Sequence, residues 1–442
     1  MAGSLIRRAA LAPTHREDPT QMVTASALDA TYHGLAEETQ RLYRRLGTLP
    51  VHDISPDMAA AITGLPWRHA EAGLGILADE YLLEPAAAHH DGVRYRLVTA
   101  AHARELALQH DPEDERLLVQ RRLCEWLLSI ASQAQQRLTP AQETLQMSLG
   151  CAFPAYTAPF ADDAGALAWL ETHEGALLEI LKVAEVAGWH ELVWRTVDAF
   201  WPLFLRRHPY ELWVAAHEIG LAAARRAGHD AAVRQMLASG AIGLNAAGRL
   251  DEAITWGTLA LEAARAAGDV RDEGQALHGL GECHAQAGRQ AHARGLLTQA
   301  ISRWEECGYR RGVALSTIVL GEIALADNAD CALYLFTKAY TLLLQVNDSF
   351  DAARALALKG HARVLTGDVA AGIGEMKEAL RMLVEAGGAR WQARTLELLG
   401  RAHQGLGETQ TAGAFYRLSA ALYADLAMPE AARAVQALEQ AL

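Results

Sequence analysis

A ladder of small residues recurs through the second half of this 442-residue chain and constrains its fold more than any other feature. A small residue follows each anchor glycine about twelve positions later, and another comes seven positions after that. Side chains at the crossing of two packed helices set how closely the helices approach. A ladder with a period near forty residues therefore predicts about five stacked helical hairpins over residues 230–428. The anchors, spaced 40, 39 and 40 residues apart, are Gly281, Gly321, Gly360 and Gly400.

The segments on either side of the ladder also read as helices. Residues 161–229 predict the first hairpins of the array, and several tryptophans at helical spacing there are typical of a core. Residues 429–442 predict a helix that caps the last hairpin. Glycine or asparagine recurs where the chain must turn between helices. The expected turns and boundaries lie near Gly248, Gly268, Gly288, Gly308, Asn328, Asn347, Gly367, Gly387 and Gly407.

The N-terminal part has a different pattern. Residues 1–22 are expected to form a flexible arm. Helices are predicted over 37–46, over 56–62 with Ser55 as the N-cap, and after Pro66. Two strands, 81–84 and 93–98, follow around a Gly-containing turn. This order predicts a winged-helix-like domain over 23–110, followed by connecting helices and a linker over 111–160. The fold class is thus all-α, with a small β-hairpin wing followed by a right-handed superhelix.

Composition excludes several classes of function. The net charge of −13 disfavours non-specific binding of nucleic acid or of anionic membranes. We find no signal peptide and no membrane span, and five scattered cysteines fit a reducing cytoplasm. No nucleophile stands beside a base, and no Gly-rich loop precedes a lysine. Eighteen histidines show no ligand spacing. We therefore predict no catalytic, cofactor-binding or metal-binding residues, and no enzyme.

Several blocks resemble a known family of regulators. They include VTASALDATYHGL (23–35), QRLYRRLGTLP (40–50), LADEYLLE (77–84), RYRLVTAAHARELA (94–107) and ALAWLETHEGALLEIL (166–181). In this order they resemble the winged-helix and tetratricopeptide-repeat region of actinobacterial antibiotic regulatory proteins (SARP-type) and related NB-ARC signal-transducing ATPases. The resemblance implies a role in gene control or specialised metabolism.

Two departures from that family affect the expected mechanism. The ATPase domain expected before Val23 is missing, and the motif G-x-x-x-x-G-K-[ST] does not occur. The family's nucleotide-sensing His-Asp pair after the wing is also missing, because Arg94–Leu97 runs directly into Val98–His102. The resemblance therefore implies a chain without ATP switching.

The concave groove of the repeats is the predicted binding surface. In tetratricopeptide arrays the first helix of each hairpin lines this groove. Amides can hold a peptide backbone, and arginines can pair with its carboxylates. Counting from each anchor glycine, the groove-facing positions are Gln235, Asn245, Gln275, His278, Glu282, Gln286, Glu322, Arg354, His361, Arg394, Glu397, Arg401 and Gln404.

The winged helix offers an alternative binding surface. Only Arg68 and His69 on the third helix, with Arg94 and Arg96 in the wing, could contact DNA. The third helix nevertheless carries more acidic than basic residues, so we do not favour DNA binding.

The leading prediction is a cytoplasmic, non-enzymatic regulatory protein that binds a peptide or protein. The runner-up is a DNA-binding transcription regulator, and a third possibility is an accessory protein that presents a peptide substrate to biosynthetic enzymes. Expected partners are a peptide or protein, an ATPase or transcription regulator supplied in trans, and a second copy of the chain, but not a membrane.

Overall fold

The computed structural model describes residues 19–86, 92–142, 145, 156–426 and 430–441. These residues form two compact units. Unit 1 extends to Val119, within helix α6 (Glu113–Leu138), and unit 2 takes up the remainder from Gln120 to the C-terminus. Residues 1–18 of the expected arm and most of the expected linker lie outside the described residues, whereas residues 19–22 are already helical.

Unit 1 combines short helices with a three-stranded antiparallel sheet of order β1-β3-β2. The predicted cap is present, since Ser55 Oγ accepts a hydrogen bond from Met58 N at 3.2 Å, and Gly64 ends the same helix with φ of 73°. Leucines at helical spacing, such as Leu42 and Leu74, form the core. The elements are α1 (Pro19–Gly34), α2 (Glu37–Gly47), β1 (Asp53–Ile54), α3 (Pro56–Thr63), α4 (Trp67–Asp79), β2 (Leu83–Pro85), β3 (Tyr95–Leu97) and α5 (Ala100–His110).

The sheet differs from its prediction in two respects. Tyr81 does not belong to a strand, because its φ of 58° is left-handed and its side chain is exposed. Strand β1 was not predicted, and it pairs with β3 so that Asp53 lies opposite Arg96. Two residues are too few for an alternating pattern to be visible in the sequence.

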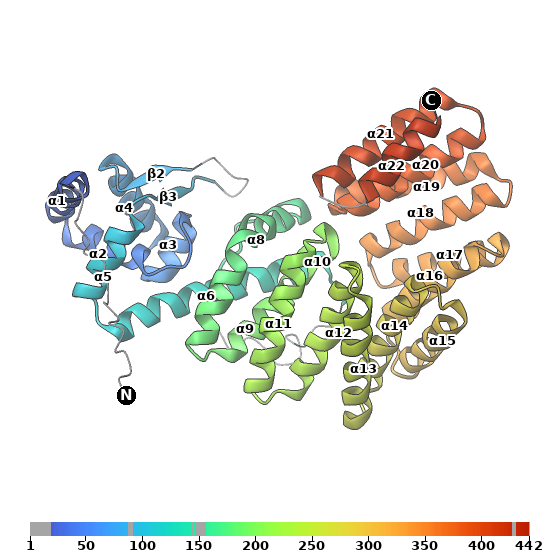
Figure 1. The fold of residues 1–442 in the computed structure, drawn as a ribbon, viewed down its shortest axis with the longest axis horizontal. Coiled ribbons are helices and arrows are strands. Elements are labelled where there is room, and N and C mark those ends of the chain that lie inside the picture. Colours follow the sequence, from blue (N-terminus) through green and yellow to red (C-terminus); the bar gives the residue numbers. More distant parts are fainter. Residues whose placement is uncertain (1–18, 87–91, 143–144, 146–155, 427–429, 442) are drawn as a thin grey trace, which may run out of the picture. The chain divides into compact units, whose positions relative to one another are not determined.

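Unit 2 is a succession of antiparallel helical hairpins that stack in sequence order (Figure 1). Residues with positive φ end helices at eight of the nine predicted positions, from Gly248 (77°) through Asn347 (58°) to Gly407 (75°). Asn328 differs, because its φ is −152° and its side chain caps the start of α17 by accepting a hydrogen bond from Cys331 N. After α6 the helices are α8 (Asp163–Val186), α9 (His190–Ala199), α10 (Trp201–Arg207), α11 (Tyr210–Arg226), α12 (Asp230–Ala246), α13 (Leu250–Ala267), α14 (Val270–Gln286), α15 (Gln290–Glu306), α16 (Arg310–Leu325), α17 (Ala329–Gln345), α18 (Ser349–Leu365), α19 (Val369–Ala386), α20 (Ala389–Gly405), α21 (Thr409–Asp425) and α22 (Glu430–Ala441).

The ladder glycines lie inside the hairpins, as predicted. Three of the four do more than allow two helices to approach closely, because each faces one particular large side chain. A Cβ on Gly281 would lie 2.7 Å from Leu297, one on Gly321 2.6 Å from Phe336, and one on Gly400 2.7 Å from Tyr416. Each of these glycines therefore makes room for one large side chain from the second helix of its hairpin. Gly360 is the exception, because its Cβ would lie 2.7 Å from the carbonyl oxygen of Gly372.

We expect Gly360→Ala to destabilise unit 2 by about 1–3 kcal/mol, since neither backbone can move without separating α18 from α19. Gly374→Ala on α19 is the matched control, because its Cβ would meet nothing within 4 Å. That substitution should stabilise the protein by about 0.4–1 kcal/mol. Urea unfolding followed by circular dichroism would measure both, and equal stability of the two variants would contradict the packing role.

Helix α10 and the residue after it also contact three helices near the other end of the array, α18, α19 and α20. Arg206 on α10 donates hydrogen bonds to the carbonyl oxygens of Ala386 and Leu138, and its guanidinium lies 5.3 Å from the centre of the Phe350 ring. His208 lies 3.2 Å from Arg390 of α20. These contacts join helices about 180 residues apart in sequence, so the concave side of the array is partly enclosed.

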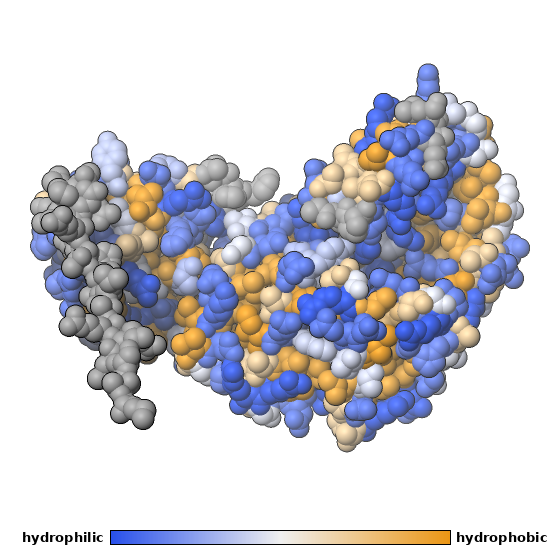
Figure 2. Space-filling view, in the orientation of Figure 1, coloured by the Kyte–Doolittle hydropathy of each residue, from blue (hydrophilic) through white to orange (hydrophobic). Residues whose placement is uncertain are grey.

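Hydrophilic residues predominate on the face shown in Figure 2, with smaller hydrophobic groups between them. Within the described part of the chain, no helix combines the length and the apolar character needed to cross a membrane.

Candidate functional site

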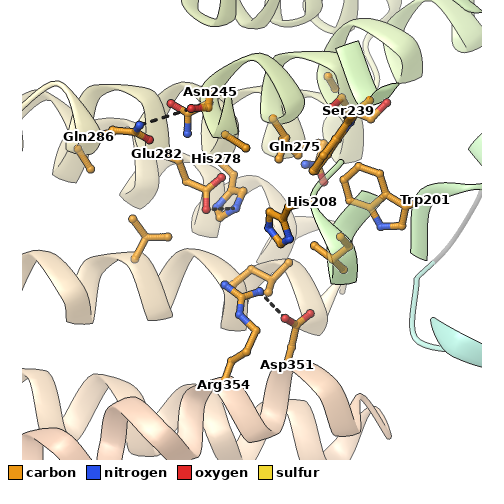
Figure 3. A pocket seen from close by; sticks show the side chains of 18 of the residues that line it. Trp201, His208, Ser239, Asn245, Gln275, His278, Glu282, Gln286, Asp351 and Arg354 are labelled. Carbon is orange, nitrogen blue, oxygen red and sulfur yellow. Dashed lines mark hydrogen bonds and ion pairs between the residues drawn. The ribbon is translucent and has the colours of Figure 1, made fainter. Parts of the chain in front are cut away.

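The concave side of unit 2 contains a cavity of about 820 Å³. Its walls come mainly from α10, α11 and the first helix of each later hairpin, namely α12, α14, α16, α18 and α20, and Gln142, Gln290 and Glu430 complete the lining. This volume lies toward the upper end of the range of about 300–1,000 Å³ that is typical of ligand sites. Figure 3 shows side chains from these helices converging on the cavity.

The structure brings nine of the thirteen predicted groove residues to this cavity. They share a place on the first helix of a hairpin, as the spacing from the anchor glycines predicted. The nine are Gln235, Asn245, Gln275, His278, Glu282, Gln286, Glu322, Arg354 and Arg394.

The other four predicted residues do not line the cavity. Glu397 is 3% exposed and pairs with Arg401 at 2.6 Å and with Arg433 of α22 at 3.3 Å. Gln404 accepts a hydrogen bond from Tyr416, and His361 has its pKa lowered to about 4 by burial and by nearby Arg401 and Arg394. The positions counted from the anchor glycine were wrong for Glu397 in the last hairpin, because α22 packs against that hairpin and Arg433 of α22 pairs with Glu397.

The predicted arginines are already paired within the protein. Arg354 pairs with Asp351 on the same helix, and Arg394 pairs with Glu322 of α16 at 3.1 Å. Both guanidinium groups also lie over the Trp391 ring, at 4.7 and 5.4 Å from its centre. The expectation that these arginines pair with ligand carboxylates therefore needs revision, because a ligand would have to displace an existing partner.

Buried polar atoms without hydrogen-bond partners are concentrated around the cavity. Among the described residues these include Trp201 Nε1, His208 Nδ1 and Asn245 Oδ1. Trp201 and His208 are each only 7% exposed. Leaving a buried polar group without a partner costs about 1–3 kcal/mol, so a ligand that supplied the partners would be stabilised here.

The tautomer of His208 follows from its neighbour. A guanidinium can only donate, so His208 Nε2 accepts from Arg390 at 3.2 Å. Burial, together with nearby Arg390 and Arg354, lowers the pKa of His208 well below its usual value. The neutral ring then carries its proton on Nδ1, which becomes a donor directed to no protein acceptor.

Two similar arginine–aspartate clusters join hairpins along the cavity wall. Arg234 of α12 pairs with Asp269 (3.0 Å) and Asp272 (2.7 Å) at the start of α14. In the second cluster Arg311 of α16 pairs with Asp348 (2.7 Å) and Asp351 (2.6 Å) at the start of α18. In each cluster the first aspartate also caps its helix, through Asp272 N and Asp351 N respectively. Each cluster fixes the spacing of two first helices that line the cavity.

Sequence reasoning missed the aromatic and basic residues that complete the cavity. Trp201, His208 and Trp213 precede the regular repeats, so the forty-residue spacing could not include them. A signal for the ion-pair clusters was present, because D-x-x-D occurs at both helix starts, as Asp269–Asp272 and Asp348–Asp351.

The residues proposed for DNA contact are not gathered on one accessible surface. Arg68 and His69 are exposed at the start of α4. Arg94 is only 3% exposed, and Arg96 forms two hydrogen bonds with Asp53, at 2.8 and 3.2 Å. Arg96 is therefore engaged within the sheet, and Arg94 is buried.

Within the residues that the structure describes, no group of three or more His, Cys, Asp or Glu side chains could hold a metal ion. The described cysteines near the repeats differ in exposure, and burial raises the pKa of Cys283 to about 12. A thiol with so high a pKa is not a nucleophile at neutral pH.

Comparisons with known proteins support the repeat assignment. A family model described as tetratricopeptide repeat matches residues 241–306. "Regulatory protein AfsR" of Streptomyces griseus is 26% identical over 95% of this chain, and the protein of the same name from Streptomyces coelicolor is 29% identical over 69%. The chain spans only 46% and 32% of the lengths of these relatives.

Among solved structures, a Rap protein complexed with competence and sporulation factor covers 94% of this chain and 98% of its own length. It has a TM-score of 0.48 and 11% sequence identity. The chain thus contains tetratricopeptide repeats and has homologues among regulatory proteins, whereas the winged-helix assignment and the missing ATPase domain stay predictions.

Proposed function

We propose that this chain is a non-enzymatic regulatory protein whose repeats bind a short peptide, or an extended segment of a protein, in the cavity of unit 2. The observation that carries this proposal is the set of buried polar atoms without partners around one cavity, on α10, α12 and the residue that follows α10. A peptide supplies both donors and acceptors along its backbone, so one extended ligand could satisfy groups on several helices.

The regulatory part of the proposal rests on the relatives. Both are named regulatory proteins, and they match 95% and 69% of the chain. A peptide that occupies the cavity would contact α12, α14, α16 and α20 together, so its binding would favour one spacing of these hairpins over others. Such a shift can alter what the outer surface of the array binds.

Filling the cavity tests the proposal. We expect Ala238→Trp, which places an indole in the cavity, to abolish enrichment of peptides from a bead-bound library of random hexapeptides. Gln275→Trp should have the same effect from α14. Thr258→Trp on the exposed face of α13 is the control and should enrich the same sequences as the unaltered protein. Circular dichroism would verify folding, and equal enrichment by all variants would refute binding in this cavity.

A further inference from the structure

Most of the carboxylates that line the cavity are paired with arginines of the protein. Asp351 pairs with Arg311 and Arg354, Glu322 pairs with Arg394, and Glu430 pairs with Arg390 at 3.3 Å. Asp272 also pairs with Arg234. Among the described residues, neither Glu211 nor Glu282 forms an ion pair with an arginine or lysine. Glu211 is exposed and has Arg249 in its vicinity, whereas the Glu282 side chain is only 28% exposed.

The nearest basic group to Glu282 does not neutralise it. His278 Nε2 lies 3.6 Å from Glu282 Oε1, on the preceding turn of α14. Burial lowers the pKa of His278, nearby Arg354 and Arg311 lower it further, and only Glu282 and Asp351 act in the opposite direction. His278 Nδ1 is occupied by Ser316 Oγ at 3.0 Å. The imidazole is therefore neutral near pH 7 and places no positive charge beside the Glu282 carboxyl group.

Two amide groups extend this acceptor surface. Asn245 Oδ1 is buried and has no hydrogen-bond partner. Gln286 Nε2 donates to the backbone carbonyl of Asn245 at 3.4 Å, which orients its own amide beside Glu282. Figure 3 shows Asn245, Glu282 and Gln286 close together, on α12 and α14. Three acceptor groups with one net negative charge suit a cation with several N–H donors.

Elsewhere in the cavity, two buried groups without partners are hydrogen-bond donors rather than acceptors. Trp201 Nε1–H and His208 Nδ1–H are donors, both residues are more than nine-tenths buried, and neither donor has a partner. They would donate hydrogen bonds to carbonyl oxygens of a ligand, whereas Arg311, Arg354, Arg390 and Arg394 are already paired with protein carboxylates. A bound peptide would thus meet donors at Trp201 and His208 and acceptors at Glu282.

We propose that the peptide held in this cavity presents a cationic group, an ammonium or a guanidinium, to Glu282, while Asn245 and Gln286 accept its remaining N–H groups. This inference rests on the proposed function and specifies which peptides the cavity selects. A hydrogen bond to a charged group contributes about 1.5–3 kcal/mol, so loss of the pair should weaken binding by about 10- to 100-fold.

The test uses hexapeptides enriched from the random library by the full chain. One enriched peptide would be synthesised with each cation neutralised in turn, by citrulline for arginine, norleucine for lysine, or an acetyl group on the N-terminus. We expect one of these changes to weaken binding about 10- to 100-fold in isothermal titration calorimetry. The Glu282→Gln variant should bind the original peptide about 10- to 100-fold more weakly than the unaltered protein does. Its affinity for the neutralised peptide should be no lower than its affinity for the original peptide. Glu262→Gln, an exposed charge change on α13, is the control and should bind like the unaltered protein.

The outcomes separate the two proposals. If enriched peptides bind in the cavity but no neutralised version loses affinity, or if Glu282→Gln retains the preference for the cation, the cationic subsite is refuted and peptide binding stands. If the library yields no peptide whose enrichment depends on an open cavity, both proposals fail.

Discussion

Replacing Arg311 by methionine should destabilise unit 2 by about 3–5 kcal/mol, the largest effect that we expect from a single substitution. The Arg311 side chain is 8% exposed and lies between Asp348 and Asp351, whose side chains are 11% and 1% exposed. Methionine fills similar space but leaves buried carboxylates with too little positive charge nearby. Urea unfolding of the full chain, followed by circular dichroism and by tryptophan fluorescence, would measure the loss.

Two further variants make the Arg311 result interpretable. Arg265→Met removes a pair with Glu273 in which the arginine is 53% exposed, so its effect should stay below about 1 kcal/mol. Adding Asp348→Asn to Arg311→Met should restore part of the stability, because asparagine keeps the helix cap without the uncompensated charge. If Arg311→Met were no more destabilising than Arg265→Met, the cluster would not hold α16 and α18 together.

Acid should destabilise unit 2 through His217, which joins α11 to α12 beside the cavity. Its Nδ1 lies 2.8 Å from the carbonyl oxygen of Trp213, and its Nε2 lies 2.9 Å from Ser239 Oγ. Burial lowers the pKa of His217 to about 4. The unfolded chain therefore binds a proton near pH 6.5 that the folded chain does not bind until about pH 4. Stability is fully present above pH 6.5 and falls by up to about 3 kcal/mol as the pH decreases toward 4.

His217→Gln should show a smaller loss of stability between pH 6.5 and 4 than the unaltered protein, although it is less stable at pH 7. Asp198 acts in the opposite sense, since burial raises its pKa to about 6 despite hydrogen bonds from Gln135 and Gln235. Its ionisation lowers stability as the pH rises from about 4 to 6, so Asp198→Asn should steepen the acid loss. Unfolding free energies measured at several pH values would test both. An unchanged pH dependence in His217→Gln would show that this histidine is not held neutral.

Local sequence patterns determined the helices and their order. Glycine or asparagine with positive φ ends helices at all the predicted places except Asn328, and Ser55 caps α3, because capping depends only on residues a few positions apart. The first-helix face was predictable for the same reason, and nine predicted residues reach the cavity. Strand β1 escaped prediction, since its pairing partner Tyr95 lies about forty residues away.

Short-range patterns therefore specify a stack of helical hairpins with one polar face, because the repeat period, the caps and the small residues at helix crossings act over short distances. The shape and charge of that face depend on contacts between helices far apart in the sequence. The contacts of α10 and His208 with α19 and α20 partly enclose the cavity, and Arg433 of α22 pairs with Glu397 outside it. The structure also pairs the arginines internally and leaves Glu282 without a cation, because charge compensation depends on which helices meet across the array rather than on neighbours in the chain.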